Sequence, residues 1–448
     1  MMSCAWLKSG RGRKQKTIDS YHEIARSIAM QKPETIILIS PHQTMYADYF
    51  HISPGKEASG DFGQFRAPHV GVSVSYDSQF VDNLCHLAEE RNLPAGVLGQ
   101  RERALDHGTM VPLYFVNQYW QDYQLVRIGL SGCGLATHYE LGQIIQEAAK
   151  LLDRKTVVIA SGDLSHRLKD DGPYGYREEG PQYDRRIMEV MENGEFEGLF
   201  EFTEDFCEKA GECGHRSFTI MAGALDRMVV EAERLSHEGP FGVGYGICCY
   251  RICGKDGTRN FRERYEERQR SLLAARREQE DAYVRLARKS MEEYIRTGKI
   301  ISIPGDLPEE MYRSKAGVFV SIKKEGSLRG CIGTLSASCP SVAEEIIYNA
   351  VNASTNDPRF SPIEPAEFDR LTISVDVLGD MEKIESPDML DVKKYGVVVT
   401  KGCKRGLLLP NLDGIESVEE QIAIARQKAG IHDWERVSLE RFEVIRHY

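Results

Sequence analysis

The sequence predicts an α/β fold for the first half of the chain and an α+β fold for its last third. Three observations support the first prediction. Apolar runs without alternation occupy residues 34–39 and 156–160, and a stretch with helical spacing, residues 140–152, precedes the second run. Continuous apolar strands separated by helices are typical of a largely parallel or mixed sheet that is covered on both faces.

Both strands are expected to end where polar or ionisable side chains begin. The first run leads into Ser40-Pro41-His42, where proline removes a backbone donor, and the second leads into residues 161–166, which end at His166. Two further segments carry metal-binding or ionisable groups, around His107 and over residues 211–215. Because α/β folds bind ligands at the carboxyl ends of their strands, these segments are expected to converge at one edge of the sheet.

Composition excludes some classes of function. The chain has 448 residues, with 57 basic and 68 acidic side chains and a net charge of −11, so it offers no general electrostatic reason to bind nucleic acid or an anionic membrane. A small-molecule substrate is the better expectation. No apolar stretch approaches the length of a membrane span and no secretory h-region is seen, which predicts a cytoplasmic protein. An odd number of cysteines, 11, favours reduced thiols over a disulfide framework.

A chain of this length is expected to form two or three domains. A highly charged stretch with the helical spacing of apolar residues begins after residues 254–257. The sequence therefore predicts a first domain over residues 15–253, a charged helical linker over residues 254–280 and a second domain over residues 281–448.

The types of candidate side chain limit which reactions such a site can carry out. A neutral imidazole binds a metal or accepts a proton, and a carboxylate supplies an anionic ligand for a divalent ion. Two histidines and one carboxylate on one face of a metal ion leave positions open for a substrate and for dioxygen.

Four ordered motifs, residues 39–45, 106–113, 161–166 and 211–214, together resemble the class III extradiol ring-cleavage dioxygenases, the superfamily that includes the Memo proteins. The resemblance covers residues 15–253. It implies a non-haem iron, Fe(II), with another divalent metal as the alternative.

Carried over by motif, the resemblance makes His42 a metal ligand and Glu212 the carboxylate ligand. Cys213 is a rival to Glu212, because Memo-like relatives have a Cys-Gly pair at this point, and His215 is a weaker rival. His166 is implied as the acid/base residue and His107 as its substrate-orienting partner.

One departure from the family pattern concerns the first metal ligand. Members usually begin with a strand ending in Pro-His-Pro that supplies this histidine, whereas residues 1–16 contain no histidine. The first ligand is therefore expected to be missing, with His51 and His69 as substitutes of low expectation. Loss of a ligand would weaken metal binding sharply.

The second domain carries another signature. Residues 317–322 and 328–333 read as a hairpin and, together with residues 352–360 and 406–410, resemble the AMMECR1 domain. An exposed Arg329 beside Cys331 could bind an anion or activate the thiol. The favoured interpretation is structural, with two glycines permitting a tight hairpin and Cys331 filling the core.

Two functional hypotheses of different classes follow. The first is a non-haem iron-dependent, extradiol dioxygenase-like oxidoreductase that acts on a catechol-type or related small substrate. The second is a catalytically silent metal-binding scaffold in a radical SAM-associated modification pathway, because the fusion resembles the AmmeMemoRadiSam system. In that system a radical SAM protein, which would be a separate chain here, is the partner. Metal-assisted hydrolysis is a third hypothesis.

Overall fold

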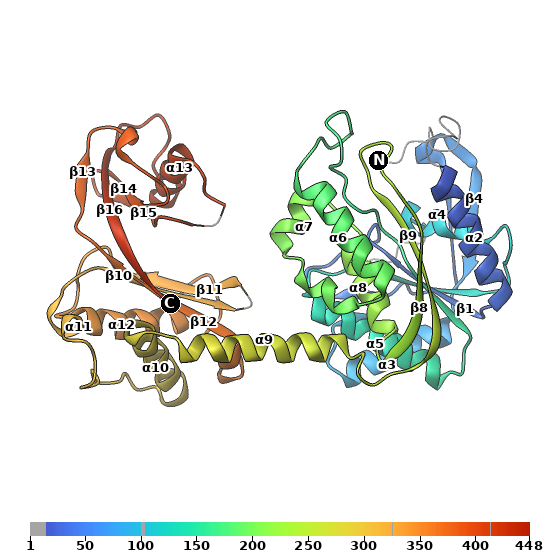
Figure 1. The fold of residues 1–448 in the computed structure, drawn as a ribbon, viewed down its shortest axis with the longest axis horizontal. Coiled ribbons are helices and arrows are strands. Elements are labelled where there is room, and N and C mark those ends of the chain that lie inside the picture. Colours follow the sequence, from blue (N-terminus) through green and yellow to red (C-terminus); the bar gives the residue numbers. More distant parts are fainter. Residues whose placement is uncertain (1–14, 100–103, 325, 413) are drawn as a thin grey trace. The chain divides into compact units, whose positions relative to one another are not determined.

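The computed structural model describes residues 15–99, 104–324, 326–412 and 414–448. The chain divides into two compact units between Glu266 and Glu267, inside helix α9 (Phe261–Glu278). The predicted domain boundaries at residues 253 and 281 stay predictions. Each unit is described by itself (Figure 1).

The first unit is built around a three-stranded parallel sheet of order β6-β1-β7. Its helices and strands are α2 (Gln15–Gln31), β1 (Thr35–Ser40), β2 (Phe50–His51), β3 (Glu57–Phe62), β4 (Ala67–Ser75), α3 (Ser78–Glu90), β5 (Ala95–Gly96), α4 (His107–Val116), β6 (Gln124–Gly129), α5 (Leu135–Leu151), β7 (Thr156–Ala160), α6 (Glu179–Asn193), α7 (Glu204–Ala210), α8 (His215–Ala224), β8 (Met228–Glu238) and β9 (Tyr245–Lys255), with 3-10 helices at Gly63–Phe65 and Phe196–Glu201. Strands β8 and β9 form a separate antiparallel hairpin.

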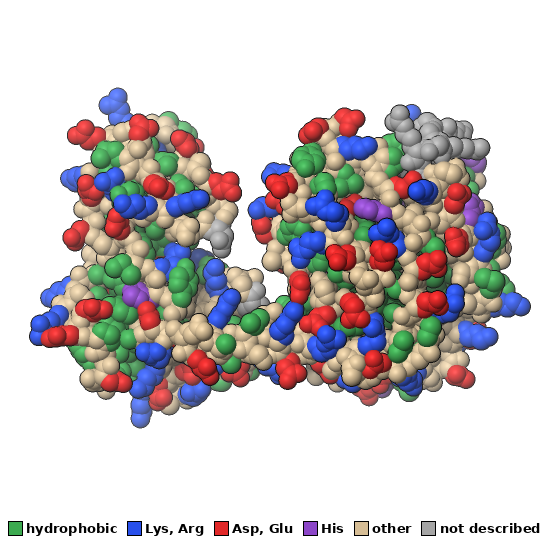
Figure 2. All heavy atoms as spheres, viewed as in Figure 1, with side chains coloured by type: hydrophobic (Ala, Val, Ile, Leu, Met, Phe, Trp, Pro, Cys, Tyr) green, Lys and Arg blue, Asp and Glu red, His purple; other side chains and the backbone are tan. Residues whose placement is uncertain are grey.

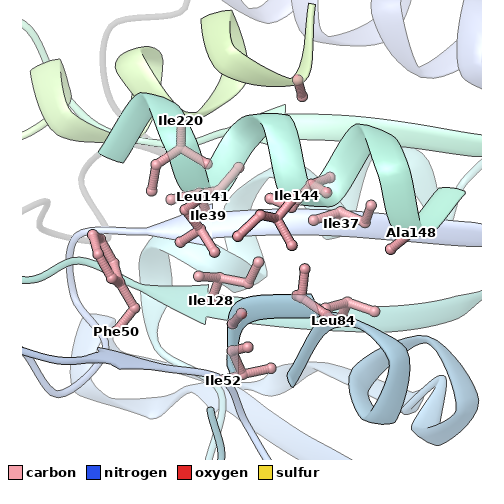
Figure 3. Close-up of a cluster of buried hydrophobic side chains, with 14 of the residues drawn as sticks. Ile37, Ile39, Phe50, Ile52, Leu84, Ile128, Leu141, Ile144, Ala148 and Ile220 are labelled. Carbon is pink, nitrogen blue, oxygen red and sulfur yellow. The ribbon is translucent and has the colours of Figure 1, made fainter. Parts of the chain in front are cut away.

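Strand β1 is buried along its whole length because helices cover both faces of the sheet. On one face, Ile37 and Ile39 pack against α5 and α3, and Figure 3 shows α5 contributing Leu141 and Ile144 to this cluster. On the other face, the side chains of β1 pack with α2 and α4. This two-sided burial explains why β1 is a continuous apolar run, and it confirms the predicted α/β class for the N-terminal region.

The second unit contains a curled antiparallel sheet with order β11-β10-β12-β16-β14-β15, in which β13 also pairs with β16. Its elements after α9 are α10 (Ala282–Thr297), α11 (Glu309–Arg313), β10 (Val318–Lys324), β11 (Ser327–Gly333), α12 (Val342–Thr355), β12 (Leu371–Leu378), β13 (Glu382–Ile384), β14 (Tyr395–Lys401), β15 (Lys404–Leu408), α13 (Val418–Ala429) and β16 (Ser438–His447), with 3-10 helices at Pro365–Arg370 and Pro387–Met389. Helices α10 and α12 pack on β10 and β12, and α13 packs on β14 and β15. The predicted α+β class is confirmed.

Among the described helices, none combines the length and the apolar character needed to cross a bilayer. Acidic and basic side chains are interspersed over the face of the molecule seen in Figure 2.

Candidate metal centre

The candidate site lies where two neighbouring parallel strands end. Strand β1 is followed by Pro41 and His42, and β7 is followed by Ser161, Gly162 and Asp163. The two strands pair in parallel from Thr35 and Thr156 onward, so their carboxyl ends meet at the same edge of the sheet. The convergence expected from the sequence is therefore present for these two strand ends.

A largely buried carboxylate, Asp106, organises one side of the site. Its Oδ1 accepts hydrogen bonds from Ser40 Oγ at 2.5 Å and from the backbone N–H of Thr109 at 2.9 Å, so Asp106 is the N-cap of α4. The guanidinium of Arg127, which is fully buried, lies 3.5 Å from Asp106 Oδ2. The backbone N–H of His42 donates to Ser40 Oγ at 3.2 Å. Through Asp106, the start of α4 is tied to the end of β1.

This arrangement places two histidines side by side. The ring centroids of His42 and His107 lie 4.0 Å apart, with an interplanar angle of 32°. A side chain at Gly108 would meet Ser40 Oγ at 2.6 Å and His42 Cδ2 at 3.0 Å, so glycine is what permits the approach. Burial lowers the pKa of both histidines, and the neighbouring His42 lowers that of His107 further. Both imidazoles are thus neutral near pH 7 and can accept a proton.

A second group provides metal-ligand atoms. One ligand atom from each of Asp163, His166 and Cys213 lies within 4.8 Å of the other two. His166 Nε2 is 3.6 Å from Asp163 Oδ2, and the backbone N–H of Asp163 donates to Cys213 Sγ at 3.2 Å. Burial, and then the charge of Asp163, raise the pKa of the Cys213 thiol. A bound cation would reverse that effect, because it stabilises the thiolate.

Two glycines bring the loops of this second group together. Gly162 has a φ of +154°, and a side chain there would meet Gly214 Cα at 2.3 Å. The loop after β7 and the turn before α8 can therefore pass in direct backbone contact. That contact sets Asp163 beside Cys213.

The two groups form one electrostatic neighbourhood. His42, His107 and Asp163 line one cavity, and the charge of Asp163 raises the pKa of both histidines against the effect of burial. Aromatic rings border the group: Tyr174 stacks on His166 at 5.1 Å, and Phe65 meets His107 edge-on at 5.6 Å. The structure thus brings together the predicted residues His42, His107, His166 and Cys213.

Glu212 occupies a different position. Its Oε2 accepts from the backbone N–H of His215 at 2.7 Å, at the start of α8, and from the hydroxyl of Tyr183 at 3.5 Å. Burial raises the pKa of Glu212, and the hydrogen bond from the backbone N–H of His215 acts against this rise. The carboxylate is near the site but outside the group of three ligand atoms, and its role as a metal ligand stays a prediction.

Asp163 is the candidate ligand that the sequence reasoning passed over. It lies in the 161–166 motif, from which only His166 was expected in the site. The available signal was its position after a buried strand and a glycine, three residues before His166, where a turn can bring both side chains to one ion.

The other predicted histidines lie elsewhere. His51 is buried on β2 with its Nδ1 3.0 Å from the carbonyl oxygen of Leu98, and His69 is exposed on β4. His215 is enclosed, with ring nitrogens near the Tyr183 hydroxyl and the Leu199 carbonyl, and burial lowers its pKa to about 4. None of the three belongs to the ligand group found among the described residues. The expected loss of the first histidine concerns residues 1–16, of which 1–14 lie outside the described residues.

In the second unit, the structure corrects the expectation of an exposed Arg329. Its side chain is 15% exposed, and it forms a two-point hydrogen-bonded ion pair with Glu367 at 2.9 and 3.1 Å. The half-buried Cys331 accepts a hydrogen bond from Ser321 Oγ at 3.3 Å across the β10–β11 hairpin. Arg329 therefore has a structural partner instead of a free anion-binding face.

Comparison with known proteins is consistent with this architecture. A family model described as the catalytic LigB subunit of aromatic ring-opening dioxygenase matches residues 4–248, and the AMMECR1 model matches residues 284–447. Protein CA_C1420 of Clostridium acetobutylicum is 41% identical over 449 residues, covering 98% of this chain and 95% of that protein. A protein of Thermotoga maritima is 47% identical over 170 residues, covering 38% of this chain and 98% of its own length. The crystal structure of protein PH0010 from Pyrococcus horikoshii is 36% identical, with a TM-score of 0.35 over 37% of this chain and 88% of that chain.

Proposed function

Because this chain belongs to the family of the catalytic LigB subunit of aromatic ring-opening dioxygenase and carries an AMMECR1 domain after it, we propose that its first unit is a metal-dependent oxidoreductase that opens the ring of a small catechol-type substrate. One observation carries the proposal: the ligand atoms of Asp163, His166 and Cys213 lie within 4.8 Å of one another. This group adjoins the His42–His107 pair at the carboxyl ends of parallel strands.

The donor set limits which ion fits. Non-haem Fe(II) oxygenases typically use two histidines and one carboxylate, whereas the described group offers one carboxylate, one imidazole and one sulfur. These donors suit a divalent transition-metal ion, and Fe(II) is the ion proposed for ring opening. When bound, the ion would polarise the hydroxyl groups of the substrate and favour their ionisation.

The protein's own residues would then handle protons and orientation. His42 and His107 are neutral near pH 7 because burial lowers their pKa, so either imidazole can accept a proton from a substrate hydroxyl. Asp106 fixes the positions of His42 and His107, because it accepts a hydrogen bond from Ser40 and caps the start of α4. The aromatic rings of Phe65 and Tyr174 contact His107 and His166 and would give an aromatic substrate an apolar border.

The proposal is tested by metal analysis and oxygen uptake on the full chain. We expect about one ion per chain after loading with Fe(II) without oxygen, and uptake of one dioxygen per catechol opened. Cys213→Ser and Asp163→Asn should each weaken metal binding at least about tenfold. Cys207→Ser is the matched control, because Cys207 is also half-buried but lies outside the ligand group. Unchanged metal binding in both site variants would refute the site.

The sulfur donor favours a second candidate function. A site with a thiolate and one imidazole can hold Zn(II) or copper tightly without activating oxygen, as a metal-binding scaffold would. The same experiment separates the two, since the scaffold binds metal at Cys213 but consumes no oxygen with any catechol.

Partner and location are further proposals. By family association, the scaffold would act with a separate radical SAM protein in a modification pathway, in the cytoplasm. The described cysteines are all unpaired, as expected in a reducing compartment. Affinity capture of the full chain from native lysate, kept free of oxygen, should then recover an iron–sulfur protein, and its repeated absence counts against the association.

A further inference from the structure

The second unit contains a cysteine to which the proposed function gives no role. Cys331 of β11 lies directly opposite Ser321 of β10, so the two side chains point to the same face of the sheet. Val318, Val320 and Ile322 of β10 pack with α12 on the other face. Because side chains alternate along a strand, Ser321 and Cys331 lie on the face opposite α12.

The curl of the sheet turns this face toward the strands at its far end. Figure 1 shows β10, β11 and β12 with α12 in one lobe of the unit and β14, β15 and α13 in the other. Phe319, which alternates with the residues that face α12, belongs to one apolar cluster with Val398 of β14 and Leu407 of β15. A side chain at Gly333 would meet the ring of Phe319 at 2.2 Å, so this ring lies over β11 two residues from Cys331. The thiol thus lies on the inner face of the curled sheet, beside an aromatic ring.

A buried carboxylate fixes the backbone of this cysteine. Asp357, which is 4% exposed, accepts a hydrogen bond from the N–H of Cys331 at 2.9 Å and two from the guanidinium of Arg359, at 2.9 and 2.7 Å. Arg359 donates in turn to the carbonyl oxygen of Cys331 at 3.2 Å. Both backbone groups of Cys331 are therefore held by the Asp357–Arg359 ion pair.

Two hydrogen-bond donors approach the sulfur itself. Ser321 Oγ donates to Cys331 Sγ at 3.3 Å. The pKa of Arg359 is raised mainly by its hydrogen bond to Asp357, and a hydrogen bond with the Cys331 side chain raises it further. The cation beside the thiol is thus Arg359, whereas the sequence pointed to Arg329, whose guanidinium is bound elsewhere.

A second cation comes from the other lobe. Lys428, on α13, forms no hydrogen bond or ion pair with the residues that the structure describes. Partial desolvation lowers the pKa of Lys428, the Cys331 thiol opposes this effect, and Arg359 adds to it, so the three groups act on one another. Since Asp357 already neutralises Arg359, the ammonium of Lys428 is an unmatched positive charge near the thiol.

We propose that Cys331 is a reactive thiol that forms a mixed disulfide with a small disulfide carrying carboxylate groups. The deprotonated sulfur attacks one sulfur of that disulfide, so that a new S–S bond forms while the old one breaks. The leaving thiolate takes the electron pair of the broken bond, and the proton of Cys331 goes to water. A second thiol reverses the exchange. The proposal goes beyond the proposed function, because it needs neither a metal nor a residue of the first unit.

The surroundings of Cys331 favour this reaction over acyl transfer. Thiols with cationic and hydrogen-bonding neighbours are the ones that react as thiolates. Acyl transfer also needs free N–H groups for an oxyanion, whereas the N–H of Cys331 is bound to Asp357. A disulfide needs no such group, because its leaving thiolate is stable in water. The positive charge of Lys428 then favours a carboxylate-bearing disulfide over a neutral or cationic one.

Mixed-disulfide formation on the full chain tests the proposal. The probes are dithiobis(nitrobenzoate), which carries carboxylates, and cystamine, which carries ammonium groups, and mass spectrometry of peptides gives the rate at each cysteine. Cys253 is the internal comparison, because it is exposed and, like Cys331, follows an arginine by two residues. We expect the ratio of the anionic to the cationic rate to be at least about tenfold higher at Cys331 than at Cys253. In urea, the ratios at the two cysteines should become equal.

Substitutions separate binding of the anion from reactivity of the thiol. Lys428→Met should lower the ratio at Cys331 by roughly threefold or more, and Lys428→Arg should retain it. Lys289→Met is the matched control and should have no effect, because Lys289 is exposed on α10, which covers the opposite face of the sheet. Ser321→Ala should slow both probes by roughly fivefold and leave the ratio unchanged.

Two results would overturn the proposal. One is a ratio at Cys331 that does not exceed the ratio at Cys253, and the other is a ratio that Lys428→Met leaves unchanged. Because the ratio compares two probes on the same chain, a change in overall stability does not produce either result. Metal loading of the first unit has no part in the measurement, so its outcome is independent of the proposed function.

Discussion

The imidazole rings of His42 and His107 lie with their centroids 4.0 Å apart, although one follows strand β1 and the other begins helix α4. Neither ring is held by a direct bond to the other. Their positions are set through Ser40, whose Oγ accepts from His42 N–H and donates to Asp106, the N-cap of α4. The position of the pair therefore depends on Asp106, which acts through Ser40 and through the backbone at the start of α4.

The first prediction concerns the buried ion pair beneath that carboxylate. Asp106→Asn leaves the fully buried Arg127 without its counter-charge, and we expect the free energy of unfolding to fall by roughly 3 kcal/mol. Asp106→Asn combined with Arg127→Met should recover part of this loss, since no buried charge is then left alone. Urea unfolding of the single and double variants gives the coupling energy.

An exposed ion pair is the control for this cycle. Arg251 and Glu231 lie 3.1 Å apart on the β8–β9 hairpin, with both side chains largely exposed. Their coupling should be below about 1 kcal/mol. If the buried pair couples no more strongly than this one, the electrostatic account of Asp106 is wrong.

The second prediction concerns Gly108. Gly108→Ala adds a methyl group 2.6 Å from Ser40 Oγ and 3.0 Å from His42 Cδ2, which should push His42 away from His107 and toward water. Since burial is the main cause of the lowered pKa of both histidines, each pKa should rise toward its ordinary value. An NMR titration of the imidazole signals measures this shift.

Gly254→Ala is the matched control, because a side chain there meets nothing within 4 Å. It should leave both titrations unchanged. Unaltered histidine pKa values in Gly108→Ala would mean that the pair does not depend on this close approach.

The ends of the strands could be predicted from the sequence. Which of several neighbouring side chains lies in the site could not be predicted. The runs that became β1 and β7 are continuous and rich in β-branched residues, so their ends, and hence the edge with His42 and His166, followed from pattern alone. Whether Glu212 or Cys213 faces Asp163 depends on the turn at Gly211, which has a φ of +67°, and on the backbone contact of Gly162 with Gly214. Such contacts between distant segments leave no periodic signal.

The boundary between α9 and α10, by contrast, does have a local signal in the sequence. The sequence predicts a charged helical linker over residues 254–280 that leads into the first helix of the second domain, and in the structure α9 ends at Glu278 and α10 begins at Ala282. Asp281 separates them as the N-cap of α10, accepting from the backbone N–H groups of Tyr283 and Val284. An aspartate before an apolar helical pattern is a recognised start signal.

The third prediction concerns the pH dependence of stability in the first unit. Burial lowers the pKa of His138 and His215 to about 4, so the folded state keeps both neutral while the unfolded state binds protons below about 6.5. The stabilisation is fully present above pH 6.5 and is lost as pH falls toward 4, by up to about 3 kcal/mol per histidine.

The second unit should respond at lower pH. Hydrogen bonds from Arg359 and Arg329 lower the pKa of Asp357 and Glu367 to about 2, so the contribution of these two carboxylates to stability persists until the pH falls below about 4.5 and is lost toward 2.

Urea unfolding at pH 7 and 5.5, followed by hydrogen exchange in both units, should therefore show destabilisation of the first unit only. His138→Leu should flatten its pH dependence and His86→Leu, on the surface, should not. Equal loss in both units contradicts this assignment.

The fourth prediction concerns the fork formed by Arg329 in the second unit. Its guanidinium binds both carboxylate oxygens of Glu367 and the carbonyl oxygens of Ser361 and Pro362, at 2.7 and 3.2 Å for the carbonyls. Arg329→Lys keeps the charge but cannot reproduce four bonds in one plane, so we expect a loss of roughly 1–3 kcal/mol in the free energy of unfolding.

The comparison variant is Arg313→Lys, which changes a largely exposed ion pair with Glu309 and should lower the free energy of unfolding only slightly.

Binding of inorganic phosphate provides the second measurement. Since the donors of Arg329 are already used within the protein, phosphate should stabilise the wild-type chain and Arg329→Lys equally. A neutral effect of Arg329→Lys on unfolding, or phosphate stabilisation that disappears with it, would favour the anion-binding alternative for Arg329 over the structural one.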